Sequence, residues 1–332
     1  MKANVLDQFG DAENFIWREM PTPQPGPNEV LLRVTASGVN LGDTLIRSGK
    51  AGWQLPLPLI LGSEAVGVVE ALGNQVHEFA IGQRVLAAPF ATGGLGGGYA
   101  THICLPASAV FALAAGVSDE TAVALGVAGI TALELTHKVP LEGRAVLVHA
   151  AAGGVGNILL QLVRASGAST VLAVVGDQGK AAGIDGLGAD HVLDSRGDWA
   201  SEAVTLTDGR GPDVIFDAVG GELSRAGLAV LAQLGHFVAY GGASGTYPAI
   251  STSDMPAFVM KCQMLVGFSI MPMLMSGTAR EVIELGFANL HARVLDGTLR
   301  PLIGARFPLD QVADAHRLIE SRQSVGKIIL VP

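Results

Sequence analysis

The feature that most constrains this chain is a glycine-rich turn at residues 144–156 (RAVLVHAAAGGVG). Before it, Ala145–His149 is short, apolar and partly β-branched, which is typical of a strand buried on both faces. After it, Asn157–Arg164 repeats apolar residues at helical spacing. A strand, glycine turn and helix in this order favour binding of a dinucleotide phosphate, because the glycines admit the pyrophosphate and the helix N-terminus offers unpaired N–H groups.

The turn matches the full fingerprint G-x-G-x-x-G only in part. The aligned hexapeptide is AAGGVG, so an alanine, Ala151, stands at the first glycine position. An ordinary strand-to-helix turn in any α/β protein can also contain such a cluster. Because a strand and a helix flank it, we predict that the phosphate-binding residues are Gly153, Gly154, Val155 and Gly156.

The composition excludes several classes of protein. A chain of 332 residues that is 49% hydrophobic and 15% charged suits about two domains with large cores. Its net charge of −9 is spread along the chain, which argues against a nucleic-acid surface. Apolar runs are too short to span a membrane, and the N-terminus lacks a secretory pattern. Two distant cysteines, Cys104 and Cys262, suggest a reducing, cytoplasmic setting.

The pattern of elements changes near residue 120. Short strands separated by glycine are expected before it, at Val30–Val34, Val66–Val69, Arg84–Ala87 and Ala100–Leu105. After it comes a helix, Asp119–Leu135, with Ser118 as its N-cap. Strands then alternate with helices at Ala145–His149, Thr170–Val175, His191–Leu193, Val214–Asp217, His236–Tyr240 and Gln263–Phe268. This alternation predicts an α/β doubly wound parallel sheet.

The two ends of the chain are expected to share a domain. Helices at Thr278–Leu295 and Leu309–Ser321 precede a closing strand, Lys327–Val331. We predict a mostly β domain from residues 1–120 plus 270–332, with a nucleotide-binding domain, residues 121–269, inserted in it.

Four separated motifs resemble those of one enzyme family. They are GVNLGDTLIRSG at 38–49, LGSEAVGVVEALGNQVHEFAIGQRV at 61–85, DVIFDAVGG at 213–221 and VGKIIL at 325–330. With VHAAAGGVG they resemble, over the whole length, the zinc-independent quinone oxidoreductases (ζ-crystallin-like proteins) of the medium-chain dehydrogenase/reductase superfamily. The resemblance implies a GroES-like catalytic domain, a Rossmann domain that binds NADPH, and a homodimer paired through the sixth Rossmann strand.

The zinc ligands of related alcohol dehydrogenases are replaced. Asn40 stands at a cysteine position and Ser63 at a histidine position of those enzymes. An amide and a hydroxyl are poor zinc ligands, so we expect no metal. Glu64 remains, and we interpret it as a structural carboxylate that pairs with a neighbouring cation or with backbone donors.

The choice between NAD and NADP depends on the residues after the second Rossmann strand. An NAD site needs an acid there for the ribose 2′-OH, and Asp177 could serve if the alignment is shifted by two residues. Lys180, however, matches a lysine that similar enzymes place against the 2′-phosphate, and cationic or hydroxyl partners suit that phosphate. We therefore predict NADPH, held on this side by Gly176, Lys180, Ser195 and Arg196.

The resemblance also assigns residues to the nicotinamide half of the cofactor. They are Asn40, Thr131, Gly241 and Phe268, of which the last three could equally be packing residues. Asn40 would donate its amide N–H to a substrate carbonyl. Asp43 is a second catalytic candidate, although it could instead cap a helix and pair with Arg47 four residues later.

The predicted reaction is a metal-free hydride transfer from NADPH to a quinone or a related conjugated carbonyl, with solvent as the proton source. Leu45 replaces a tyrosine of several quinone oxidoreductases, which leaves the substrate class open. The alternatives are reduction of the C=C bond of an enone or 2-enoyl thioester, and a structural or regulatory NADPH-binding protein with little turnover. A methionine-rich stretch, residues 255–275, would be a permissive pocket, core or a dimer contact.

Overall fold

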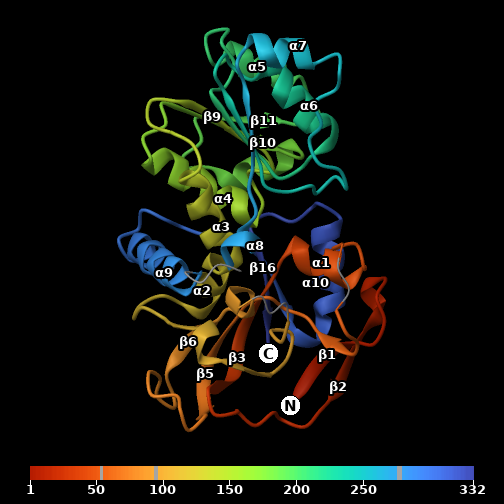
Figure 1. The fold of residues 1–332 in the computed structure, drawn as a ribbon, viewed down its shortest axis with the longest axis vertical. Helices are drawn as coiled ribbons and strands as arrows, with labels where there is room; N and C mark the ends of the chain where they lie inside the picture. The colour runs from red at the N-terminus through yellow and green to blue at the C-terminus, as the bar shows by residue number, and fades with distance from the viewer. Residues whose placement is uncertain (53–54, 93–95, 275–278) are drawn as a thin grey trace. The chain divides into compact units, whose positions relative to one another are not determined.

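A computed structural model describes residues 1–52, 55–92, 96–274 and 279–332 of the chain (Figure 1). The chain forms two compact units. One unit is Met1–Ile130 together with Met271–Pro332, and the other is Thr131–Ile270. The predicted fold class is confirmed, because the first unit is mostly β and the second contains a doubly wound parallel sheet.

The sheet of the second unit has six parallel strands. Their spatial order is β11-β10-β9-β12-β13-β14, so the order reverses between β9 and β12, where doubly wound folds bind nucleotides. All six strands were expected from the sequence, and their ends differ by at most one residue. Their bounds are β9 Ala145–Val148, β10 Thr170–Val175, β11 His191–Asp194, β12 Val214–Asp217, β13 His236–Ala239 and β14 Met264–Gly267.

Helices cover both faces of this sheet (Figure 1). Trp199 of α5 and Leu228 of α6 share one buried cluster with Leu147, Ile215 and Phe237 of the strands. Alternate strand residues face the other way, and α4 packs against β9 and β10. The helices are α3 Val127–Thr136, α4 Gly154–Ala165, α5 Trp199–Thr205, α6 Gly221–Val230 and α7 Met255–Met260, with a 3-10 segment, η4, at Gln178–Ile184.

The first unit is built on a seven-stranded sheet of order β15-β16-β3-β5-β6-β8, with β7 also paired to β3, and on a small sheet of order β2-β1-β4. In the larger sheet β16 runs antiparallel to β3, with Ile328 opposite Val39, so the strand that starts at Lys327 lies beside the end of β3. The strands are β1 Lys2–Leu6, β2 Phe15–Glu19, β3 Glu29–Val39, β4 Leu59–Ile60, β5 Ala65–Leu72, β6 Arg84–Ala87, β7 His102–Pro106, β8 Val110–Ala112, β15 Ile303–Pro308 and β16 Lys327–Val331.

One helix predicted from the sequence differs from the structure. The helix expected at Asp119–Leu135 is two helices, which break at Gly126, where ψ is −110°. A side chain at Gly126 would lie 2.0 Å from the Glu64 carboxylate, so the break makes room for that group. Ser118 is confirmed as the N-cap, and the predicted helix start at Thr278 lies outside the described residues. The helices are α1 Leu41–Arg47, α2 Asp119–Leu125, α8 Ile270–Leu274, α9 Ala279–Leu295 and α10 Val312–Glu320, with 3-10 turns η1 Ala12–Asn14, η2 Pro89–Thr92, η3 Ala107–Ala109 and η5 Leu309–Gln311.

Candidate functional site

The turn from β9 to α4 is shaped for close approach of a ligand to the backbone. Gly153 is the N-cap residue, and its N–H donates to the Ala150 carbonyl at 2.9 Å. A Cβ at Gly156 would lie 2.4 Å from that same carbonyl oxygen, so only glycine lets the helix begin so near the turn. The first-turn N–H groups of Gly154, Val155 and Gly156 have no acceptor within α4. A pyrophosphate fits this arrangement of small residues and free donors.

The other predicted cofactor residues of this unit follow the carboxyl ends of its strands. Because all six strands are parallel, residues after their ends meet at one edge of the sheet. The structure thereby gathers, along that edge, Gly153–Gly156 after β9, Gly176 and Lys180 after β10, Ser195 and Arg196 after β11, Gly241 after β13 and Phe268 after β14. Thr131 lies on α3 and is half-buried.

The loops after β10 and β11 form a charged cluster. Asp194 joins the two loops, since its carboxylate accepts from the Gln178 N–H at 3.1 Å and the Arg196 N–H at 2.9 Å. The Asp177 carboxylate accepts from the Gly179 N–H at 2.7 Å and lies 3.5 Å from Arg196 Nη2. It is therefore already occupied by a backbone donor and a cation.

Lys180 belongs to the same cluster. Partial burial lowers the pKa of Lys180, Asp177 opposes this shift, and the Arg196 guanidinium adds to it. Lys180 and Arg196 thus lie beside the Asp177 carboxylate, and Asp177 and Asp194 together balance the two cations. The ammonium and the guanidinium are the groups of this cluster that suit an anion such as a phosphate monoester.

The ends of β12, β13 and β14 approach one another closely. A Cβ at Gly241 would lie 2.8 Å from the Ala218 carbonyl oxygen, so a larger residue would separate the two chain segments. The Phe268 N–H donates to the Ala239 carbonyl at 2.8 Å, and the Lys138 ammonium lies 5.3 Å from the Phe268 ring centre. These contacts fix the backbone at this end of the sheet.

A buried histidine–aspartate contact joins the first and fourth of the predicted sheet strands. His149 Nδ1 lies 2.8 Å from Asp217 Oδ1, and neither side chain is exposed. Burial alone would raise the pKa of Asp217, but hydrogen bonds, chiefly from His149 and also from Ser224 and the Val219 N–H, hold it below its usual value. The pair holds the loop after β12. The sequence placed His149 at the end of a predicted strand but did not reveal its acidic partner.

In the first unit, Asn40 follows β3 directly and is half-buried. Its Oδ1 accepts from Lys327 Nζ at 2.6 Å, and its Nδ2 donates to Glu64 Oε1 at 2.8 Å and Ser63 Oγ at 3.0 Å. An ammonium only donates and a carboxylate only accepts, so these two partners determine which end of the amide is oxygen. Both amide hydrogens are therefore occupied.

Glu64 and Lys327 form a buried ion pair, with side chains 0% and 3% exposed. Glu64 also accepts from the Val127 N–H, which the break at Gly126 directs toward it. The interpretation of Glu64 as a structural carboxylate is confirmed.

This donor set does not suit zinc. The ligands at the positions discussed are an amide, a hydroxyl and one carboxylate that already binds an ammonium. Over the part of the chain that the structure describes, no three His, Cys, Asp or Glu side chains gather as a metal site.

Asp43, three residues after Asn40 in the first turn of α1, is 1% exposed. Its Oδ2 accepts from the Asn40 N–H at 2.9 Å and from the Tyr99 hydroxyl at 3.0 Å, and His316 Nε2 lies 3.1 Å from that hydroxyl. Burial raises the pKa of Asp43 to about 6, against the Asn40 hydrogen bond, and the charge of Glu64 adds to the rise. Tyr99 is fully buried, and burial lowers the pKa of His316 to about 3.

Arg47 does not pair with Asp43, so the interpretation of these residues as an i, i+4 pair is wrong. Arg47 Nη1 donates to the Gly10 carbonyl at 2.8 Å, and its other terminal nitrogen pairs with Glu320 of α10. Asp43 instead caps α1 through the Asn40 N–H. His316 was not found from the sequence, because its only signal is one histidine on a distant amphipathic helix.

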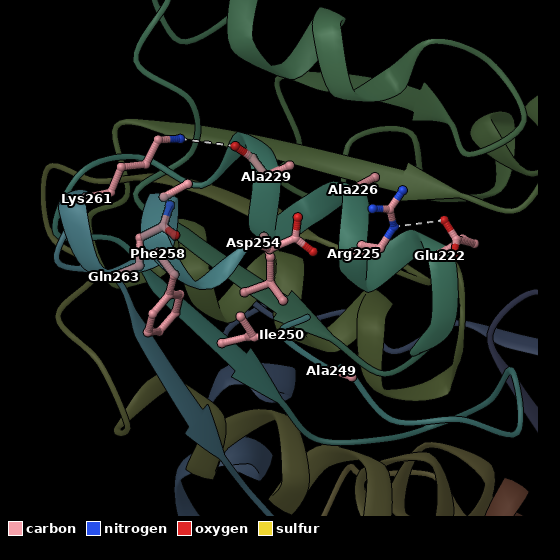
Figure 2. A pocket seen from close by; sticks show the side chains of 12 residues that line it. Glu222, Arg225, Ala226, Ala229, Ala249, Ile250, Asp254, Phe258, Lys261 and Gln263 are labelled. Atoms are coloured by element: carbon pink, nitrogen blue, oxygen red, sulfur yellow. Dashed lines mark hydrogen bonds and ion pairs between the residues drawn. The ribbon is translucent and has the colours of Figure 1, made fainter. Parts of the chain in front are cut away.

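A cavity of about 260 Å³ lies in the second unit between α6 and α7 (Figure 2). Figure 2 shows Arg225 turned toward Glu222, 3.3 Å away, and Lys261 turned toward the Ala229 carbonyl, 3.1 Å away. Gln263 donates to the Leu231 carbonyl at 2.7 Å. Since these polar groups already have partners, we do not take this cavity as the substrate site.

Both units of the chain resemble domains of known proteins. Residues 26–115 match the alcohol dehydrogenase GroES-like domain, and residues 187–330 match the zinc-binding dehydrogenase domain. The 2-haloacrylate reductase of a Burkholderia species is 34% identical, over 99% of this chain and 98% of that protein. The quinone oxidoreductase of Pseudomonas aeruginosa is 32% identical, over 98% and 97%. The structure of Escherichia coli quinone oxidoreductase complexed with NADPH has a TM-score of 0.89 and 28% identity, with 100% of both chains covered.

A GroES-like unit combined with a Rossmann unit defines the medium-chain dehydrogenase/reductase class of oxidoreductases. Within that class, this chain belongs to the zinc-independent quinone oxidoreductase family. Asn40 and Ser63, which replace two zinc ligands, agree with membership of a zinc-independent family. The description of one matching domain nevertheless contains the word zinc.

Proposed function

We propose that the protein is an NADPH-dependent, metal-free reductase that transfers hydride to a quinone or a related conjugated carbonyl. The observation that carries the proposal is the edge of the parallel sheet, where a free helix N-terminus lies at the end of β9 and the Lys180–Arg196 cluster follows the next two strands. A dinucleotide with an additional phosphate matches both features. The NADPH complex of the Escherichia coli relative supports the same cofactor.

Each group of predicted residues would bind a different part of the cofactor. Gly153, Gly154, Val155 and Gly156 would hold the pyrophosphate; Gly176, Lys180, Ser195 and Arg196 the 2′-phosphate side; and Asn40, Thr131, Gly241 and Phe268 the nicotinamide half. NADPH supplies the hydride when it is bound. We assign Asp43 to positioning, because its buried carboxylate holds the Asn40 backbone and the Tyr99 hydroxyl. Solvent supplies the proton.

A second candidate is reduction of an activated C=C bond, as in enones or 2-enoyl thioesters. The similarity to a 2-haloacrylate reductase favours it. Loss of NADPH absorbance with 1,4-naphthoquinone, and separately with 2-cyclohexen-1-one, distinguishes the two. Tight NADPH binding without turnover of either compound would instead indicate a structural or regulatory protein.

Cofactor choice is tested with the double variant Lys180→Ala, Arg196→Ala. Each charge-assisted contact contributes roughly 1.5–3 kcal/mol, so the Kd for NADPH should rise at least about 10-fold. The Kd for NADH, which lacks the phosphate, should change by less than about 2-fold. Arg225→Ala is the control, since Arg225 is an exposed cation of the same unit that pairs with Glu222. An unchanged preference for NADPH in the double variant would exclude these residues as the phosphate site.

We also propose a homodimer in a cytoplasmic setting. β14 is the outer strand of its sheet, and Val259, Met260 and Leu265 near it are 61%, 78% and 43% exposed. An apolar edge strand without a partner promotes pairing with a second copy. Sedimentation equilibrium should show a dimer that Leu265→Lys dissociates, whereas Leu285→Lys, at an exposed leucine of α9, should not. Both cysteines are free, which supports a reducing compartment.

A further inference from the structure

The contacts of Asn40 raise a problem for its predicted role as a hydrogen-bond donor to substrate. Both amide hydrogens are occupied, one by the buried Glu64 carboxylate and one by Ser63 Oγ. Donation to a substrate would require one of these bonds to break. Leaving a buried polar group without its partner costs about 1–3 kcal/mol, and more for a charged group. Asn40 is therefore poorly placed to donate directly.

Ser63 is better placed. Its Oγ accepts from Asn40 Nδ2 at 3.0 Å, so its own hydrogen is free to be donated, and no acceptor for it occurs among the described residues. Ser63 retains 8% exposure, whereas Glu64 behind it has none. Within the network, Ser63 and the half-buried Asn40 are therefore the members that retain some exposure to solvent, while Glu64 and Lys327 are buried.

The hydrogen bonds from Lys327 to Ser63 all run in one direction. The Lys327 ammonium donates to Asn40 Oδ1, and Asn40 Nδ2 donates to Ser63 Oγ. Each bond polarises the next, so a hydroxyl at the end of such a chain is a stronger donor than an isolated one. The buried cation thus supports the donor strength of Ser63 without contacting the substrate itself.

We propose that Ser63 is a catalytic residue that donates its hydroxyl hydrogen bond to the carbonyl oxygen of the acceptor, and that Lys327 is a positioning residue that acts through Asn40. The proposal rests on the proposed function. When hydride reaches the conjugated carbon, an electron pair moves onto the carbonyl oxygen, and the cofactor is oxidised to NADP⁺. Ser63 stabilises the negative charge on that oxygen, and a proton from solvent then neutralises it.

The test compares Ser63→Ala with Ser63→Thr and Ser37→Ala. Removal of one donor to a developing oxyanion lowers kcat about 100-fold, so Ser63→Ala should lose about that much with 1,4-naphthoquinone or 2-cyclohexen-1-one. Ser63→Thr should retain most of the activity. Ser37 is a buried neighbouring serine that donates to the Glu64 carbonyl at 2.8 Å, so its alanine variant controls for loss of a nearby hydroxyl. NADPH fluorescence should show the same Kd in all variants.

The role of Lys327 is tested with the double variant Glu64→Gln, Lys327→Met, which removes both charges together. It should lower kcat in the wild-type background and have no further effect in the Ser63→Ala background, because the cation acts through the hydroxyl. A merely structural role would give the same loss in both backgrounds. A Ser63→Ala enzyme with kcat within about 3-fold of wild type would overturn the inference alone, whereas no turnover by the wild-type protein would overturn the proposed function with it.

Discussion

The buried pair Glu64–Lys327 makes a strong prediction about stability. Both side chains are almost completely buried, and Glu64 has two further donors, the Asn40 amide and the Val127 N–H. In Lys327→Met the carboxylate would keep those donors but lose its only cation in the described contacts. Removing one partner of a buried ion pair costs about 3–5 kcal/mol, because the other charge remains without compensation.

The expected change is measurable by thermal unfolding. For a domain of this size, 1 kcal/mol shifts Tm by about 2–4 °C, so Lys327→Met should lower Tm by roughly 6–20 °C. Glu64→Gln should also destabilise, because it leaves a buried ammonium. The double variant Glu64→Gln, Lys327→Met has no uncompensated charge, and its loss should be clearly smaller than the sum of the two single losses.

An exposed ion pair supplies the control for this experiment. Arg33→Met disrupts the pair with Glu70, in which the side chains are 50% and 37% exposed, so it should change the free energy of unfolding by less than about 1 kcal/mol. The reasoning would be refuted by a Lys327→Met protein as stable as the Arg33→Met protein. Strictly additive losses in the double variant would show that the two buried charges do not interact.

Two further predictions concern pH and the phosphate turn. The folded-state pKa of Asp43 is raised to about 6, above its ordinary value of 3.8, so its contribution to stability is present below about pH 4 and is lost as the pH rises through 6. From pH 4 to pH 8, urea titrations should show wild type losing about 2–3 kcal/mol relative to Asp43→Asn, and a pH-independent difference would contradict this. Gly156→Ala would place a Cβ 2.4 Å from the Ala150 carbonyl oxygen, whereas a Cβ at Gly42, the position of the control variant Gly42→Ala, meets nothing within 4 Å. Fluorescence titration and thermal unfolding should show weaker NADPH binding and a loss of about 1–3 kcal/mol for Gly156→Ala only.

Strands of the parallel sheet were predictable because they are buried on both faces. A segment such as Thr170–Val175 is then uniformly apolar and bounded by polar residues or glycine, so both its type and its ends are visible in the sequence. β1, β2, β4, β8 and β15 were not predicted. β2 and β15 have only half-buried and exposed positions, so they mix polar and apolar residues. β4 and β8 are only two and three residues long, and β1 is mostly buried but contains Lys2 and Asn4. β15 alternates half-buried and exposed positions, which gives no apolar run.

The break between α2 and α3 could not be read from local sequence. Residues 119–135 have the composition of one continuous helix, and a single glycine within a helix is tolerated. The cause of the break is a tertiary contact, the carboxylate of Glu64, which occupies the space that a side chain at Gly126 would need. A residue 62 positions earlier in the chain thus determines where the helix ends.

Prediction of site residues was limited in the same way. Asn40, Ser63 and Glu64 were singled out because they stand at or beside former zinc-ligand positions, but their partner Lys327 is far away in sequence. Only the pairing of β16 with β3 brings Lys327 to Asn40. The direction of the Asn40 amide, and with it the choice of hydrogen-bond donor, depends on that contact.

These contacts explain why a glutamate remains where zinc ligands have been replaced. In this chain the Lys327 ammonium supplies a buried positive charge beside Glu64, and the carboxylate balances it. Glutamine at position 64 could still accept the Val127 N–H but would leave the ammonium without a counter-charge. Ammonium and carboxylate together orient the Asn40 amide, because one accepts no hydrogen and the other donates none. Glu64 is therefore needed as the partner of a fixed cation, and its effect on catalysis should reach the substrate only through Asn40 and Ser63.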